Sequence, residues 1–505
     1  MGLEKKIRKA MRDIVTPSAF SVIPSNRKGT IHIEDALTRI NPMAYRDEKM
    51  TGRELFDRVW APIAVVLADS FSAGYVLLVD DRLNVIQKQA KKEEHMRRQK
   101  ATARSIIRKN QFYAAKAAKE TKETGVFVEP KKDESNKPYK AGAILKDEGL
   151  VWPVERTTGN KEEEEEKDPV PFHLARLLCG DRRIIWDYFV SKLQHRQIPR
   201  KKIVVFESSA VGPWIATSAG CAQYPQLAHD HGESDLSILY YMWYFRKHPI
   251  RIITTDTDLM ALAMVYLQRC HLQAKLEHRD VSEVVNPAIE WVYVNQEKTP
   301  LKRFGLELAK YYVVDMVEMY RQMSKRWSGF HFYLACVLSG TDHYNKQLIT
   351  SGYGWEIIFE AVSILHEIKD PFIPCVFNRK SDVIKDVAYQ MRRFRLLVTM
   401  LAAARKAKGQ ITRTGWIEYS GKLTRSAFIQ SFKGSLPVEG DPEVSDVAYE
   451  TASIQLLFVM DYWCRDWKKY QMKPRFVVFN DDNDEEDGDD EVDLNDPNRV
   501  LFLTQ

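Results

Sequence analysis

The chain has 505 residues, of which 44% are hydrophobic and 11% aromatic, enough for packed cores. This composition excludes a disordered chain and a small disulfide-stapled domain. The net charge is only +6, but residues 480–505 carry eleven acidic residues and one basic residue, so the rest of the chain has a net charge of +16. A basic body of this kind favours nucleic acid as a partner.

The six cysteines include no CxxC pair, which argues against a zinc ribbon or a redox motif and suits a reducing compartment. The first residues are charged, and no apolar run reaches the roughly 18 residues of a membrane helix. We therefore expect an intracellular protein outside the membrane, with the nucleus or a viral replication site as candidate locations.

Short apolar runs rich in β-branched residues predict buried strands. In chain order these runs are Thr30–Ile33, Tyr75–Val79, Ile203–Phe206 and Ile250–Thr254. Helical patterns lie at Asp235–Phe245 and Leu259–Arg269, and the pattern is mostly helical from Phe330 onward. The alternation of strands and helices predicts an α/β fold with a largely parallel sheet.

Three charged stretches interrupt these elements. Residues 82–140 carry seventeen basic and seven acidic residues and are rich in helix formers, which is typical of a solvated helix or linker, or of a mobile basic helix that binds phosphates. The run Lys161–Lys167 is expected to be an exposed loop. Residues 481–493 are expected to be disordered, serving either solubility or the binding of a basic partner.

Acidic residues follow three of the predicted strands. Asp35 follows the first, Asp80 and Asp81 follow the second, and Asp256 and Asp258 follow the last and precede a helix. The carboxyl ends of strands in an open α/β sheet form the ligand crevice. An N-cap role explains a single such acid equally well, but the whole set predicts a shared site.

Two further sets of acids join them. Glu233 and Asp235 open a predicted helix, and Asp342 ends an apolar run. A spacing of two residues in extended chain places both side chains on one face, so the pairs Glu233/Asp235 and Asp256/Asp258 are each expected to present two carboxylates to one centre.

Seven carboxylates in one crevice would repel one another unless cations or protons intervened. A pair of Mg²⁺ or Mn²⁺ ions is the natural partner, and such a pair activates water for phosphodiester hydrolysis. His229 and His231 are expected to lie in a loop or behind the ligands rather than to bind metal. The sequence has no P-loop motif and no convincing Ser-His-Asp arrangement.

The ordered acids resemble those of the flap endonuclease group of structure-specific 5′ nucleases, which share a PIN-like core. The similar motifs are IHIEDALTRI, VLLVDDRLNV, GESDLS, TTDTDLM and LSGTDHYN. The resemblance implies a mostly parallel central sheet flanked by helices. It also implies two Mg²⁺ or Mn²⁺ ions held by Asp35, Asp80, Glu233, Asp235, Asp256, Asp258 and Asp342.

The same resemblance implies two DNA-binding elements. Residues 82–140 would form the family's helical arch, in which Lys92, with Lys91 and Arg98, contacts the scissile phosphate. The segment SGYGWEIIFEAVSIL is similar to the helix–two-turn–helix element. Gly352 and Gly354 would lie in its hairpin, which holds the duplex phosphate, often with K⁺; an ordinary tight turn is the alternative for these glycines.

These expectations give a domain layout. Residues 1–365 would form the PIN-like nuclease core, with the arch-like insertion at 82–140 and an extended insertion at 141–232. The helix–two-turn–helix region would span 340–365. A mostly helical extension at 366–479 and the acidic disordered tail at 480–505 would follow.

Several features depart from the family pattern. Asp81 stands where the family has glycine, residues 141–232 are longer than usual, and Tyr45 is the possible substitute for a base-stacking tyrosine. The carboxyl tail is acidic, and RVLFLTQ is only a remote variant of a sliding-clamp motif. Binding to a sliding clamp therefore stays open.

The predicted function is metal-dependent nuclease activity on branched or 5′-flap DNA in replication, repair or recombination, by a monomer. The first alternative is a 5′–3′ exoribonuclease acting on RNA, which the run DTDLMAL also resembles. The second is a catalytically silent nucleic-acid-binding or structural protein, against which the retention of seven mutually repelling carboxylates argues.

Overall fold

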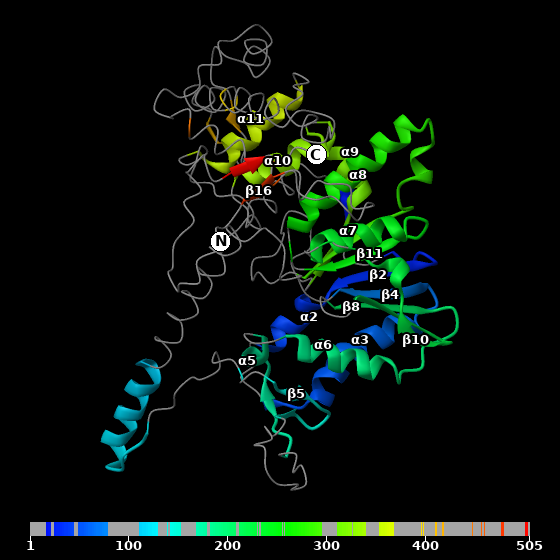
Figure 1. Ribbon diagram of the computed structural model, residues 1–505. Coiled ribbons are helices and arrows are strands. Elements are labelled where there is room, and N and C mark those ends of the chain that lie inside the picture. The colour runs from blue at the N-terminus through cyan, green and yellow to red at the C-terminus, as the bar shows by residue number, and fades with distance from the viewer. Residues whose placement is uncertain are drawn as a thin grey trace. The chain divides into compact units, whose positions relative to one another are not determined.

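The computed structural model describes about half of the chain. The described residues are 17–21, 25–44, 49–78, 111–129, 139, 142–152, 168–178, 182–208, 212–229, 231, 234–254, 256, 258–294, 311–325, 327–339, 353–367, 395, 397, 410–411, 417–418, 447, 456, 459, 476–478 and 500–502. The chain divides into two compact units. Figure 1 labels their helices and strands. Unit 1 comprises residues 1–25, 84–90 and 235–505, and unit 2 comprises residues 26–83 and 91–234.

The main strands of unit 2 are hydrogen-bonded in the order β2, β4, β8, β9, β10. Their bounds are β2 (Thr30–Asp35), β4 (Ser72–Leu78), β8 (Ile203–Ser208), β9 (Gly212–Thr217) and β10 (Gly220–Gln223). The first three are parallel, and β9 and β10 are antiparallel to their neighbours. Each of the three predicted strands in this unit is present, and each is buried because its run of apolar residues faces packed helices.

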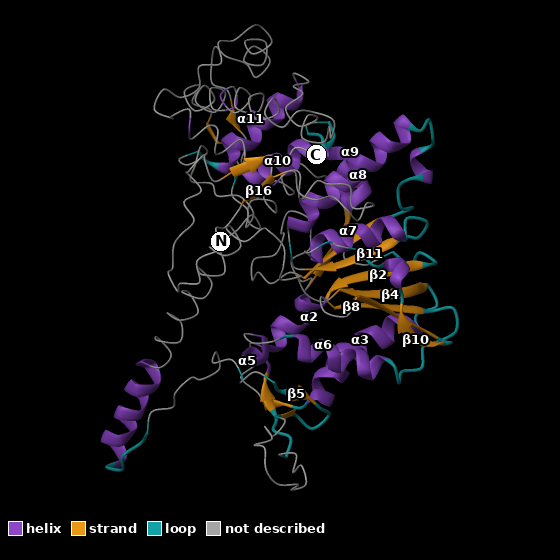
Figure 2. Ribbon diagram, viewed as in Figure 1, coloured by secondary structure: helices purple, strands orange, loops and turns teal. Residues whose placement is uncertain are grey.

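Helices cover the parallel strands of unit 2. They are α2 (Ala36–Ala44), α3 (Gly52–Ala68) and α6 (Arg183–Leu193), and α5 (Leu174–Leu178) packs against α2. Helix α3 packs on β4 and α6 on β8, on one face of these strands (Figure 2). Helix α3 begins with a capping box, in which the Thr51 side chain accepts the N–H of Glu54 while the Glu54 carboxylate accepts the N–H of Thr51.

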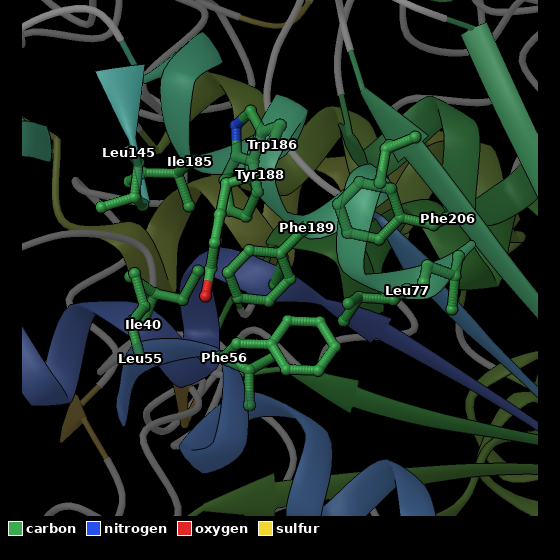
Figure 3. Packing of buried hydrophobic residues seen from close by; sticks show 14 of the residues in the cluster. Ile40, Leu55, Phe56, Leu77, Leu145, Ile185, Trp186, Tyr188, Phe189 and Phe206 are labelled. Atoms are coloured by element: carbon green, nitrogen blue, oxygen red, sulfur yellow. The ribbon is translucent and has the colours of Figure 1, made fainter. Parts of the chain in front are cut away.

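The core of unit 2 is rich in aromatic side chains. Phe56 of α3, Trp186 and Phe189 of α6 and Phe206 of β8 pack together (Figure 3). The rings of Phe189 and Phe206 stack with centroids 6.1 Å apart, and those of Trp186 and Phe206 meet edge to face at the same distance. Such pairs add to the stability that apolar burial already gives.

Smaller elements complete unit 2. Two short antiparallel pairs join β3 (Lys49–Met50) to β7 (Phe172–His173) and β5 (Ile144–Leu145) to β6 (Leu150–Val151). A 3₁₀ turn, η2, spans Pro225–Leu227. Residues 111–124 form a helix, as expected from the helix formers of the basic stretch.

Unit 1 has its own run of strands, in the order β1, β13, β12, β11. These are β1 (Phe20–Ser21), β13 (Tyr311–Asp315), β12 (Ile289–Val294) and β11 (Ile250–Thr254). Strands β11 and β12 are parallel, and the other two pairs are antiparallel. The predicted strand at Ile250–Thr254 therefore has the expected bounds.

The helices of unit 1 are largely buried. They are α7 (Ser234–Tyr244), α8 (Asp258–Leu276), α9 (Met316–Met323), α10 (Gly329–Leu338) and α11 (Trp355–Glu367). Helix α10 packs against α8 and α11, and every residue of α10 is buried. The remaining short elements are η1 (Pro17–Ala19), η3 (Val281–Glu283), β14 (Gln410–Ile411), β15 (Ile417–Glu418), β16 (Phe476–Val478) and β17 (Val500–Phe502).

The chain is thus an α/β protein with parallel central strands flanked by helices, which confirms the predicted fold at this level. Helices α10 and α11 agree with the helical pattern expected from Phe330 onward. Most of the predicted helical extension at 366–479 lies outside the described residues. None of the helices in the described part combines the length and apolarity that a membrane crossing requires.

Candidate functional site: acidic strand ends

Asp35 is the last residue of β2, where the buried strand passes directly into helix α2. The five preceding residues of β2 are buried, and Asp35 is half-buried. Its Oδ1 accepts a 2.9 Å hydrogen bond from the N–H of Leu37, in the first turn of α2. The carboxylate therefore both closes the strand–helix turn and lies at the sheet edge where the sequence predicted it.

Glu34, one residue earlier, has a different role. Its side chain is only 1% exposed and pairs with the Arg39 guanidinium of α2, with Arg39 Nη2 2.7 Å from Oε1 and 2.8 Å from Oε2. Burial raises the pKa of Glu34, and the Arg39 charge and hydrogen bond oppose that effect. Successive strand residues point to opposite faces of the sheet. Glu34 therefore links β2 to α2 through Arg39, and Asp35 is the acid that remains as a candidate metal ligand.

Glu207 lies at the same level of the unit 2 sheet as Asp35. The register pairs Asp35 with Leu78 and Leu78 with Glu207, so the three residues form a row across the ends of β2, β4 and β8. Neighbouring strands are about 4.8 Å apart, which puts the Asp35 and Glu207 backbones about 10 Å apart. Glu207 was not among the predicted site residues.

Glu207 is buried against two histidines. Its Oε2 lies 3.0 Å from Nε2 of His229, and the two residues are only 6% and 4% exposed. Nδ1 of His229 accepts the backbone N–H of His231 at 3.3 Å, and the two imidazole rings lie with centroids 4.9 Å apart. Because Nδ1 accepts a hydrogen bond, the ring proton lies on Nε2, and the Nε2–H group donates a hydrogen bond to Glu207. Both histidines lie between η2 and α7, outside helix and strand, which agrees with the loop position expected from sequence.

In unit 1, Asp256 and Asp258 follow β11 and begin α8. The N–H of Asp256 donates to Oγ1 of Thr254 at 3.0 Å, and the N–H of Asp258 donates to Oδ1 of Asp256 at 2.9 Å. Asp256 is exposed and Asp258 is half-buried. The two acids therefore lie between the end of β11 and the first residue of α8.

The expectation that each acid pair shares one face of extended chain is wrong in two places. Helix α8 begins at Asp258, and Asp235 lies in the first turn of α7, so neither residue belongs to extended chain. The reason is that acids favour the first turn of a helix, where the exposed amides and the helix dipole attract negative charge.

Several predicted site residues lie outside the described part of the chain. They are the acids Asp80, Glu233 and Asp342, the basic residues Lys91, Lys92 and Arg98, and Gly352. Gly354 is described: it is exposed, and its carbonyl accepts the N–H groups of Ile357 and Ile358 at the start of α11. This geometry is that of a helix start and does not test the predicted phosphate and K⁺ site.

The chemistry of the described acids fits a hard divalent cation. Asp35, Asp235, Asp256 and Asp258 all offer carboxylate oxygens, which Mg²⁺ and Mn²⁺ prefer over nitrogen and sulfur. Within the described residues, no group of three His, Cys, Asp or Glu side chains is gathered closely enough to form a metal site. The predicted set would need the acids that lie outside those residues.

The sequence matches no known protein-family model, and no curated protein is significantly similar to it. Its function must therefore be inferred from the chemistry and placement of the residues described above.

Proposed function

We propose that this chain is a metal-dependent, structure-specific 5′ nuclease of the flap endonuclease type, built on a PIN-like core, that hydrolyses phosphodiester bonds in branched DNA. The observation that supports it best is the position of Asp35 at the end of β2 and of Asp256 and Asp258 at the end of β11. Strands β2 and β11 each run parallel to a neighbouring strand. Ligands of open α/β sheets bind at the carboxyl ends of such parallel strands.

Carboxylates would hold the cations. Asp35, Asp235, Asp256 and Asp258 are the described donors, and Asp80, Glu233 and Asp342 complete the set that the motifs indicate. A bound pair of Mg²⁺ ions supplies a water of lowered pKa and a counter-charge for the leaving oxygen. The turns closed by Asp35 and Asp256 hold their carboxylates in place before substrate arrives, so little reorganisation is needed.

The chemical step is hydrolysis. The water oxygen forms a bond to phosphorus, the bond from phosphorus to the 3′ oxygen breaks, and the products are a 5′-phosphate and a 3′-hydroxyl. Lys92 would offset the negative charge that develops on the phosphate oxygens. The acids of the chain orient the groups around that phosphate and contribute no covalent intermediate.

The basic stretch at 82–140 would hold the single strand. Its described helix, residues 111–124, carries Lys116, Lys119 and Lys122. Phe112 is 65% exposed and Phe127 is 80% exposed. Exposed aromatic rings beside basic side chains are the usual means of binding a single strand without reading its sequence. The helix start at Gly354 would belong to the duplex-binding element.

A substrate comparison tests this function. End-labelled 5′-flap DNA, blunt duplex DNA and 5′-phosphorylated single-stranded RNA are each incubated with the protein and Mg²⁺, Mn²⁺ or EDTA. Metal-dependent cuts near the flap junction support the proposal. Stepwise loss of RNA with little flap cleavage would replace it with an exoribonuclease, and salt-sensitive binding without cleavage would replace it with a binding protein.

A further inference from the structure

Five basic residues lie in the three loops that directly precede the parallel strands of unit 2. These amino-edge loops are residues 26–29 before β2, 69–71 before β4 and 199–202 before β8. Asp69 is the one acidic residue in the three segments, which therefore carry a net charge of +4. The basic residues are Arg27, Lys28, Arg200, Lys201 and Lys202.

Hydrogen bonds join the three amino-edge loops to one another. The carbonyl of Phe71 accepts the N–H of Gly29 at 2.7 Å. Nζ of Lys202 donates to the carbonyl of Asp69 at 2.6 Å and also to that of Ser72. Strand β4 lies between β2 and β8, and neighbouring strands are about 4.8 Å apart, so the first and third loops lie about 10 Å apart with the Phe71 loop between them.

Three of the basic side chains are exposed and carry an uncompensated charge. Lys28, Arg200 and Lys201 are exposed, and within the described residues none of the three forms an ion pair or a side-chain hydrogen bond. Lys202 is different, since the loop carbonyls hold its ammonium group. Cations that no acid neutralises raise the local positive potential, which attracts polyanions.

Lys201 has a backbone conformation that lysine rarely adopts. Its φ is +65°, in the left-handed region that favours glycine. The turn is closed by the N–H of Lys202, which donates to the carbonyl of Pro199 at 3.0 Å. Glycine would close the same turn without strain but would bring no charge. The strained backbone therefore points to a role for the Lys201 side chain.

The middle loop adds an exposed aromatic ring. Phe71 is 42% exposed, and its backbone is fixed on both sides, since its N–H donates to Oδ1 of Asp69 at 2.9 Å and its carbonyl accepts from Gly29. Cations that hold phosphates, together with a ring on which a base stacks, bind a single strand without reading its sequence. Bases of an intact duplex are already stacked and would leave the ring without a partner.

We propose that the amino-edge loops bind single-stranded nucleic acid, with Lys28, Arg200 and Lys201 on phosphates and Phe71 against a base. This surface lies at the opposite end of β2 from Asp35. Strand β2 has six residues, which separates the two ends by about 17 Å. The surface is therefore distinct from the candidate metal site, and it requires nucleic acid but neither metal nor cleavage.

Binding of a fluorescein-labelled oligothymidylate in EDTA, followed by fluorescence anisotropy, tests the three cations. The patch variant replaces them with glutamine, and a control variant removes the same charge from exposed positions in unit 1. Circular dichroism and urea unfolding establish that each variant is folded. The patch variant is Lys28→Gln/Arg200→Gln/Lys201→Gln, and the control variant is Lys247→Gln/Lys275→Gln/Lys325→Gln.

The patch variant should bind the oligonucleotide about 10-fold more weakly than the wild type, and the control variant should stay within about 3-fold. The slope of log affinity against log salt should become flatter by about 2 in the patch variant alone, since each phosphate contact on a single strand contributes roughly 0.7. Equal losses in both variants would overturn the inference, because net charge rather than this surface would then govern binding.

Two single variants test the ring and the strained turn. Phe71→Leu should bind the oligonucleotide about 5-fold more weakly or worse while its binding to blunt duplex DNA is unchanged. Tyr188→Phe, which removes a 2.8 Å hydrogen bond to Asp147 in the same unit, is its control and should bind both normally. Lys201→Gly should bind more weakly although its urea midpoint is no lower than that of the wild type, since the strain is removed with the charge.

Unchanged oligonucleotide binding in Phe71→Leu would overturn the single-strand assignment, and so would a wild type that does not bind the oligonucleotide. Weaker binding of the patch variant to phosphatidylserine vesicles but not to the oligonucleotide would assign the surface to a membrane instead.

The inference and the proposed function fail separately. If the wild type cleaves flap DNA while the patch variant binds the oligonucleotide normally, the inference fails and the nuclease stands. If the patch variant loses binding and the wild type cleaves nothing, the inference stands and the nuclease proposal fails.

Discussion

The backbone N–H of Asp258 donates a 2.9 Å hydrogen bond to Oδ1 of Asp256. This contact closes an Asx turn between β11 and α8 and gives Asp256 a structural role beside the proposed catalytic one. The two roles are separable, because asparagine keeps the oxygen that closes the turn but loses the charge that a cation needs.

Asp256→Asn should leave the free energy of unfolding within about 0.5 kcal/mol of the wild type, since Asn forms Asx turns as well as Asp. Its metal-dependent cleavage rate should fall on the order of 100-fold or more, because one carboxylate ligand is neutralised. Asp256→Ala should show the same loss of rate and an additional destabilisation of about 1 kcal/mol. Urea unfolding and cleavage rates of both variants check this, and full activity in Asp256→Asn would remove Asp256 from the metal set.

The ion pair between Arg251 and Glu290 should stabilise unit 1 only as a complete pair. The two side chains are 12% and 11% exposed and lie on the parallel strands β11 and β12, with Arg251 Nη2 2.9 Å from Glu290 Oε2. Arg251 Nη2 also donates to the carbonyl of Ser25 at 2.7 Å.

Arg251→Met alone leaves a buried carboxylate and should cost about 3 kcal/mol. The double variant Arg251→Met/Glu290→Met should cost much less, and urea unfolding of the cycle measures the difference. Additive losses would contradict this account.

Gly329 should not tolerate a side chain. A Cβ at this position would lie 2.1 Å from the carbonyl oxygen of Met264 on α8, where α10 begins. Elsewhere in a helix, glycine to alanine stabilises by up to about 1 kcal/mol. Gly329→Ala should instead destabilise by about 1–3 kcal/mol, since backbone must move to admit the methyl group. The urea midpoint of Gly329→Ala should be lower than that of the wild type. A higher midpoint would show that α8 and α10 are not in such close contact.

His331 should make unit 1 sensitive to acid. Burial, with a smaller contribution from the nearby charge of His366, lowers the pKa of His331 to about 3. The ring lies 5.0 Å from that of His366, and its Nδ1 is 2.7 Å from Oγ of Ser328. In the unfolded chain His331 becomes protonated below about pH 6.5, whereas in the folded chain it stays neutral until about pH 3. The free energy of unfolding therefore decreases as the pH falls from about 6.5 towards 3.

At pH 5 this loss amounts to about 2 kcal/mol from His331. His366 is half-buried, and this partial burial lowers its pKa and adds to the same trend. Urea unfolding at pH 7 and pH 5 compares the wild type with His331→Gln, which has no proton to bind. The variant should lose about 2 kcal/mol less on acidification, and an equal loss in both proteins would exclude His331 as the source.

The sequence pattern predicted the strands and acids that depend on local signals. Asp35 and Asp256 were located because each follows a short apolar run. Such a run predicts both a buried strand and the point at which that strand ends. Helix α7 differs from its predicted bounds by one residue at each end, and α8 is longer than predicted because Cys270 and Ala274 continue its buried face past Arg269. Such boundaries depend on caps and packing more than on hydrophobic period.

Glu207 shows what the local pattern misses. It follows the predicted strand at Ile203–Phe206 as directly as Asp35 follows its own, so the same rule would have found it. What the sequence does not reveal is its partner: the contact with His229 joins residues 22 positions apart, and only the fold brings them together. The helical position of Asp258 was missed because a spacing of two residues was read as extended chain, although acids are also favoured at helix starts.

The most direct test of the central claim is single-turnover cleavage of an end-labelled 5′-flap DNA by the wild type, by Asp256→Asn and by Tyr188→Phe, with Mg²⁺ or with EDTA. The account predicts cuts near the junction that leave a 5′-phosphate, require Mg²⁺, persist in Tyr188→Phe and fall on the order of 100-fold in Asp256→Asn. Cleavage that persists in EDTA or is unchanged in Asp256→Asn would contradict it, as would the absence of any cleavage by folded wild-type protein.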